Sequence, residues 1–134
     1  MRIALKHSNS HWITGKDDDG QEFKLLVDYP NFEQQEKLEE LFYSCWGKKA
    51  DDLKLAGYIK YKRYYLKYTI KDWQNVMYED DKEVKIILKD NEMDLEQWQA
   101  LTRDPILTTK LFDLIEPELV WNETDKKKLN SQES

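Results

Sequence analysis

The sequence is poor in the residues from which most catalytic and metal sites are built. It has one cysteine, two histidines and four glycines among its 134 residues. The single thiol, Cys45, excludes an internal disulfide and any zinc site with several cysteines. No glycine-rich phosphate-binding motif and no Gly-x-Ser-x-Gly nucleophile motif occurs in the sequence. These absences predict a protein that is not an enzyme, with no catalytic residues, no metal and no cofactor.

Long apolar runs are also missing. No stretch approaches the roughly 18 consecutive apolar residues of a membrane span. The first residues, Met1 to Lys6, lack the apolar run of a signal peptide. We therefore expect a cytoplasmic protein with no membrane contact. The net charge of -6 argues against general attraction to nucleic acid or anionic lipid.

What the sequence does have is large apolar side chains. It is 40% hydrophobic and 13% aromatic, with five Trp and eight Tyr, which is too rich in these residues for a disordered chain. A chain of this length buries roughly two-thirds of its surface in one core. We expect a single α+β domain over residues 1–121 and a disordered polar tail over 122–134.

The first half of the chain predicts a hairpin followed by one helix. The expected strands are Arg2–Lys6, His11–Thr14 and Glu22–Tyr29. Gly and Asp residues at 15–20 favour a hairpin turn over a calcium loop, because the ligand spacing of an EF-hand is absent. Asn31 and Gln34 form a capping-box pattern that begins a helix over 32–46, with Cys45 on its apolar face as a buried thiol.

The second half predicts a long strand, a returning strand and two helices. Residues 48–56 are expected as a polar connection and residues 57–70 as one strand, because they are dense in aromatic and β-branched residues. An acidic turn at 79–82 leads to the strand Glu83–Leu88. Asp94 starts a short helix at 95–101, and Pro105 starts another that ends at Pro117. The predicted fold is α+β, with a small, mostly antiparallel sheet, one helix after the N-terminal hairpin and a C-terminal αα-hairpin.

The candidate site lies on the long predicted strand, where cations alternate with tyrosines, and continues just beyond it to Trp73. We predict an exposed, partner-binding surface with no catalytic role. Its residues are Tyr61, Lys62, Arg63, Tyr65 and Trp73. Tyr, Trp and Arg are enriched in protein interfaces, so the partner is a protein or a second copy of the chain. Two alternatives stay open: a single-stranded nucleic-acid binder that uses residues 57–71, and an acidic inhibitor of a host protein.

A resemblance to a known family sharpens this expectation. A strand leads to Trp73 and Val76 in a Trp-x-x-Val segment, then to the acidic turn at 79–82, a short strand, helices and a polar tail. This order of features resembles small proteins of the tail-assembly cassettes of bacteriophages and prophages, although Asp81 stands where that family usually has Gly. The resemblance implies a tail-assembly chaperone or small tail component, in the bacterial cytoplasm or the virion, that binds structural proteins.

Overall fold

The computed structural model describes residues 10–46 and 51–119, and the side chains of 46 and 51–57 lie outside that description. The predicted strand Arg2–Lys6 and the predicted tail 122–134 lie outside it as well. In chain order, the elements are β1 His11–Lys16, β2 Glu22–Val27, α1 Phe32–Trp46, α2 Asp51–Thr69, β3 Ile70–Gln74, β4 Leu88–Lys89, β5 Glu92–Met93, α3 Leu95–Thr102 and α4 Pro105–Leu119. Helices and small antiparallel sheets confirm the α+β class.

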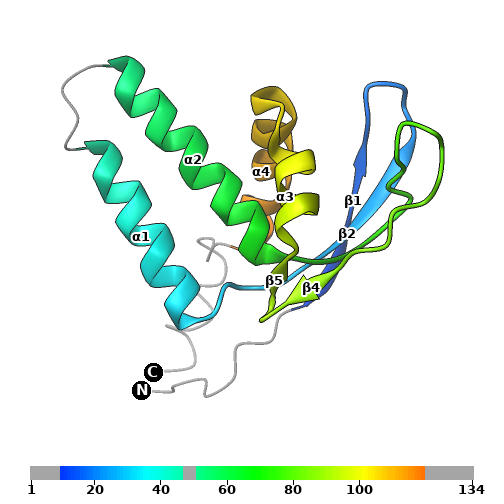
Figure 1. The fold of residues 1–134 in the computed structure, drawn as a ribbon, viewed down its shortest axis with the longest axis horizontal. Coiled ribbons are helices and arrows are strands. Elements are labelled where there is room, and N and C mark those ends of the chain that lie inside the picture. The colour runs from blue at the N-terminus through cyan, green and yellow to red at the C-terminus, as the bar shows by residue number, and fades with distance from the viewer. Residues whose placement is uncertain (1–9, 47–50, 120–134) are drawn as a thin grey trace, which may run out of the picture.

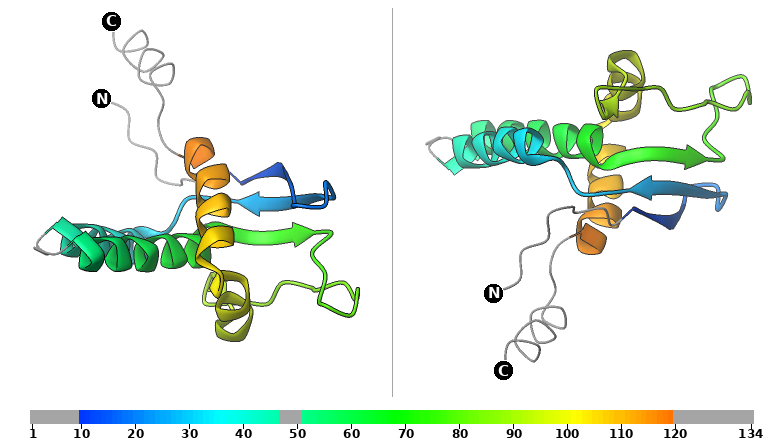
Figure 2. Two further views of the ribbon diagram at one scale, coloured as in Figure 1. Left: turned by 90° about the horizontal axis from the view of Figure 1, so that it is seen from above. Right: turned by 90° about the horizontal axis from the view of Figure 1, so that it is seen from below.

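The elements form an arm and a body (Figure 1). Helices α1 and α2 lie side by side and extend away from the sheet, whose strand order is β1-β2-β3. Helix α4 stands at the junction between this arm and the sheet (Figure 2). No helix in the described ranges has the length and apolar character that crossing a membrane requires.

The N-terminal hairpin is confirmed. Strands β1 and β2 pair antiparallel from His11 opposite Val27 to Lys16 opposite Glu22. One carboxylate oxygen of Asp17 accepts hydrogen bonds from the backbone N–H groups of Asp19 and Gln21, each at 2.9 Å. The Asp17 carboxylate is therefore held by the backbone of its own turn and needs no metal ion to hold it, so the acidic residues serve to form the turn. In the described part of the chain, no three metal-ligating side chains come together.

Helix α1 has the bounds that the capping pattern predicts. The N–H of Gln34 donates to the Asn31 side chain and the N–H of Asn31 donates to the Gln34 side chain, both at 2.9 Å. These reciprocal bonds satisfy donors that a helix start leaves free. Leu38, Leu41 and Cys45 are buried, as a helical repeat of apolar residues requires.

The predicted strand over 57–70 is wrong. Residues 51–69 form helix α2, and Ile70 alone of that range lies in a strand, β3. The predicted connection over 48–56 is wrong for residues 51–56, and two helices, not one, follow the hairpin. Aromatic residues recur at 58, 61, 65 and 68, which is one face of a helix. That spacing also explains why tyrosines fell on both faces of the supposed strand.

The returning strand Glu83–Leu88 is also wrong. Residues 83 and 77 form one isolated bridge, and within 83–88 only Leu88 lies in a strand, the two-residue β4 that pairs with β5. The side chain of Gln97 on α3 accepts from the N–H of Ile87 at 2.8 Å and donates to the carbonyl of Lys85 at 2.7 Å. These backbone groups are therefore bonded to a helix side chain in place of a strand.

The two C-terminal helices begin where the sequence predicts. Asp94 precedes α3, but its side chain makes no capping hydrogen bond and lies 3.4 Å from the Lys89 ammonium. Helix α4 starts at Pro105 and continues through Pro117 to Leu119, two residues beyond its predicted end.

One hydrophobic cluster joins the sheet, α2 and α4. Val27, Leu66, Ile70 and Ile115 have no exposed surface, and they come from four different elements. This core fixes the positions of the loops at the far ends of the strands and helices.

Candidate functional site

The structure separates the five residues of the predicted surface. Tyr61, Lys62 and Tyr65 lie in an aromatic cluster where α2 meets α4, whereas Arg63 and Trp73 lie elsewhere. The exposure that we expected is wrong for three of them, because Lys62, Tyr65 and Trp73 are all buried.

The aromatic cluster packs α4 against α2. The rings of Tyr65 and Phe112 have centroids 4.9 Å apart, and the Lys62 ammonium lies 4.6 Å from the centroid of the Tyr58 ring. Burial is the main reason why the pKa of Tyr65 rises, and burial also raises the pKa of Tyr61 to about 12. The cluster is therefore largely interior packing, with Tyr61 only half-buried at its edge.

Arg63 and Trp73 also make internal contacts. The guanidinium of Arg63 donates to the carbonyl of Thr102 at 3.0 Å, and the Trp98 indole donates to the carbonyl of Arg63 at 2.7 Å. The Trp73 indole donates to the carbonyl of Val84 at 2.8 Å. The alternative of a single-stranded nucleic-acid binder assumed an exposed strand of tyrosines over 57–71, and that premise is wrong because residues 51–69 form a helix and Tyr65 is buried.

A different surface is open and apolar. Two adjoining hollows, of about 440 and about 800 Å³, share Asp104 and Leu107. We call them together the trench. It is lined by the hairpin (Gly15, Lys16, Asp17, Asp18, Phe23), the loop 77–80 (Met77, Tyr78, Glu79, Asp80), the end of α3 (Ala100, Leu101, Arg103) and the start of α4 (Asp104, Ile106, Leu107, Lys110, Leu111, Leu114).

The trench presents large apolar side chains to solvent. Ile106 is 68% exposed, Tyr78 57%, Met77 48% and Leu107 39%. Behind them, Leu111 belongs to the buried core, so the floor of the trench is an edge of that core. Because exposed apolar side chains gather here from segments far apart in the sequence, the trench differs from isolated surface leucines.

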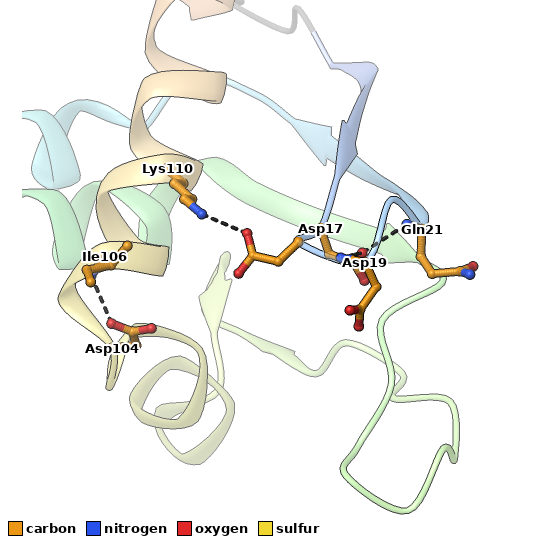
Figure 3. Close-up of polar contacts among 7 residues, drawn as sticks. Asp17, Asp19, Gln21, Asp104, Ile106 and Lys110 are labelled. Atoms are coloured by element: carbon orange, nitrogen blue, oxygen red, sulfur yellow. Dashed lines mark hydrogen bonds and ion pairs between the residues drawn. The ribbon is translucent and has the colours of Figure 1, made fainter.

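Two hydrogen bonds shape the hairpin and α4 sides of the trench, one within the start of α4 and one between α4 and the hairpin (Figure 3). The Asp104 carboxylate accepts from the N–H of Ile106 at 2.9 Å and so caps α4. The Lys110 ammonium donates to Asp18 at 2.8 Å, which connects α4 with the hairpin turn. This contact lowers the pKa of Asp18 and raises the pKa of Lys110. Both side chains are exposed, so salt screens their attraction.

Gly15 brings α4 close to the hairpin. A Cβ atom at this position would lie 2.5 Å from the tip of the Phe23 ring and 2.8 Å from a methyl of Leu114. Since both neighbours line the trench, a larger residue at Gly15 would displace its floor.

The loop that forms the opposite wall is held by its own backbone. The N–H of Tyr78 donates to the carbonyl of Lys82 at 2.8 Å, and the N–H of Asp81 donates back to the carbonyl of Tyr78 at 3.0 Å. The predicted acidic turn is confirmed. Val84 then donates to the carbonyl of Val76 at 2.8 Å. Met77 and Tyr78 are therefore exposed on a backbone with defined hydrogen bonds.

Sequence reasoning missed the trench, although two signals were present. Ile106 and Leu107 are consecutive aliphatic residues at a helix start, and one apolar stripe cannot bury both. Leu107 has the helical spacing of the buried Leu111, four residues on, yet it is exposed. Met77 and Tyr78 come directly before an acidic turn. Core packing does not explain large apolar side chains beside such a turn, so they indicated another role.

The lining of the trench suits binding to another chain. An apolar floor with a polar rim is the arrangement of protein interfaces. Carboxylates outnumber cations on the rim, with Asp17, Asp18, Glu79, Asp80 and Asp104 against Lys16, Arg103 and Lys110. Comparison with known proteins adds no relative, because no family model, no curated protein and no solved structure matches this chain.

Proposed function

We propose that this protein is a non-catalytic binding protein that holds a structural protein in the trench during assembly of a phage or prophage tail. The observation that carries the proposal is the set of exposed apolar side chains on two hydrogen-bonded walls, led by Ile106 and Tyr78. A partner that covers them would remove apolar surface from water, and this is the main driving force of protein association.

The tail-assembly part of the proposal is supported by the resemblance in the sequence. Asp81 stands where the resembling family usually has Gly, and its φ is +62°. Glycine adopts this left-handed backbone without strain, and Asp tolerates it better than most residues. The backbone at Asp81 is thus compatible with the glycine of that family's turn.

Co-purification with the structural proteins encoded beside its own gene tests the proposal. Ile106→Asp places a charge on the apolar α4 wall of the trench and should weaken capture at least about tenfold, as expected for a central interface residue. Leu95→Asp is the matched control. Leu95 is also an exposed aliphatic residue in the first turn of a helix, is 53% exposed, and lies outside the trench.

Two outcomes would overturn the trench as the docking site. One is equal capture by the Ile106→Asp variant and the parent protein, and the other is equal loss in both variants. Light scattering of the purified protein separates a partner of a different sequence from a second copy of the chain. Self-association that Ile106→Asp abolishes would identify the second copy as the occupant of the trench.

A further inference from the structure

The half of the trench between the hairpin and α4 is a hollow with an apolar floor. Its volume is about 440 Å³, and pockets for small molecules range from roughly 300 to 1,000 Å³, so it has room for a bicyclic ring. Leu111 is buried at the floor, and Phe23 and Leu114 are partly buried beside it. Because these side chains belong to the packed core, the floor is held in place before a ligand binds.

The charged side chains that line this hollow are all exposed at its rim. They are Lys16, Asp17, Asp18, Asp104 and Lys110. Asp18 and Lys110 pair with each other at 2.8 Å, and Asp17 and Asp104 accept hydrogen bonds from backbone N–H groups of their own segments. Three carboxylates therefore stand against two ammonium groups, and the net charge does not select a charged ligand. The occupant that suits the apolar floor is an uncharged side chain.

The carboxylates make the rim rich in hydrogen-bond acceptors. The bonds of Asp17, Asp18 and Asp104 all use the Oδ1 atom. Within the described residues, the Oδ2 atom of each makes no hydrogen bond and can accept one from a ligand. An ionised carboxylate only accepts hydrogen bonds. The rim therefore matches an apolar group that carries a single donor.

Asp104 is the best placed of the three acceptors. It lines both hollows of the trench. Its bond to the N–H of Ile106 at 2.9 Å fixes the carboxylate at the start of α4 (Figure 3), whereas the side chain of Asp18 is 90% exposed. A carboxylate that is already fixed loses less conformational entropy when it accepts a further hydrogen bond.

We propose that this hollow binds the side chain of one tryptophan of the partner, as the anchor by which the trench holds that partner. The inference rests on the proposed function, which places a protein in the trench. The indole ring lies on Leu111 and Leu114, and its N–H donates to Asp104. Tryptophan suits both parts of the hollow, because its ring is large and apolar and its N–H donates but does not accept. Phenylalanine has no donor, and aliphatic side chains have neither the ring nor the donor.

Titration of the full chain with capped amino acids tests this proposal. The probes are N-acetyl amides of tryptophan, 1-methyltryptophan and leucine, and the readout is the NMR shift of the methyl resonances of Ile106, Leu111 and Leu114. We expect saturable shifts with the tryptophan probe and at least about fivefold weaker binding of the other two, which lack the indole N–H. Equal binding of either control probe, or no saturable binding of the tryptophan probe, would overturn the proposal.

Asp104→Asn identifies the acceptor. Asparagine caps a helix about as well as aspartate. Its side-chain oxygen keeps the bond to the N–H of Ile106, and an NH₂ group, which cannot accept, replaces the second carboxylate oxygen. This variant should lose the preference for tryptophan over 1-methyltryptophan. Asp113→Asn, an exposed position on the same helix outside the lining, should keep it. An undiminished preference in Asp104→Asn would overturn the proposal.

The same probe separates this inference from the proposed function. Ile106→Asp should weaken binding of the tryptophan probe at least about fivefold, and Leu95→Asp should leave it unchanged. Loss of partner capture in Ile106→Asp, with no binding of the tryptophan probe to the parent protein, would keep the trench as the docking site and overturn the tryptophan anchor. Partner capture that Ile106→Asp does not change would instead overturn the docking site, and the anchor with it.

Discussion

The core of the body and the contact between the arm and α4 use different kinds of side chain. The body is closed by aliphatic residues without exposed surface, such as Val27, Ile70 and Ile115. The arm is joined to α4 by rings and a lysine, among which Tyr58 and Tyr61 remain half-exposed. The comparison shows how one small chain combines a close-packed core, which determines stability, with aromatic surface that can still make contacts. Substitutions of the buried core residues should therefore lower stability, and substitutions of exposed side chains should mainly change binding.

The largest effect is expected from a core deletion in the body. Ile115→Ala removes a side chain with no exposed surface, and it should lower the free energy of unfolding by about 2 to 5 kcal/mol. Ile106→Ala, on the same helix but 68% exposed, should change it by less than about 0.5 kcal/mol. Urea unfolding of both variants measures the difference. Similar losses would mean that Ile106 is packed inside the core.

A smaller loss is expected where the body depends on one hydrogen bond. Trp73→Phe leaves the carbonyl of Val84 without its indole donor, and an unpaired buried acceptor costs about 1 to 3 kcal/mol. The control is Trp12→Phe, since Trp12 is 42% exposed. Thermal unfolding should show a lower Tm for Trp73→Phe alone. A shared shift would argue that ring size, and not the hydrogen bond, is responsible.

The start of the arm should be more tolerant. Asn31→Ala removes the acceptor for the N–H of Gln34 and should cost about 1 kcal/mol. Asp94→Ala at the start of α3 removes no capping bond, only a contact with the exposed Lys89, and should cost less. Hydrogen exchange in the first turns of α1 and α3 compares the two. Faster exchange in α3 than in α1 would contradict the comparison.

The smallest effect concerns alkaline pH. Burial first, then Glu116, raises the pKa of Tyr61 from 10.0 to about 12. Between these pH values Tyr61 keeps its phenol proton in the folded state and loses it in the unfolded state. The contribution of this proton to the free energy of unfolding is therefore full below pH 10 and is lost as the pH rises towards 12. Tyr61→Phe should flatten the decline of stability in that range, measured by urea unfolding at several pH values. An unchanged decline would show that Tyr61 does not contribute to it.

Local signals predicted some elements of the fold well. The hairpin turn and α1 were predictable because Asp17, Asn31 and Gln34 act on backbone within four residues of themselves. Helix α2 was not, because Tyr and Ile favour strands as isolated residues. Its rings share one helix face, and that face packs on Phe112, far along the chain. Tertiary packing overrode the local preference here.

The candidate surfaces were harder to predict for the same reason. The trench combines a hairpin turn, the loop 77–80 and the α3–α4 corner, and no local pattern brings these segments together. The prediction of the partner-binding surface was wrong for a different reason. Its residues were grouped by a strand's alternation, whereas the helix points Lys62 towards Tyr58 and Arg63 towards Thr102. A one-residue step turns a helix by about 100°, so neighbours in the sequence face different partners.

The most direct test of the account is hydrogen exchange of the protein alone and in complex with a protein that co-purification identifies as its partner. The account predicts slower exchange on binding in the loop 77–80 and in residues 104–110, the two walls of the trench. Formation of a complex in which these segments exchange as fast as in the free protein would contradict the trench as the binding site.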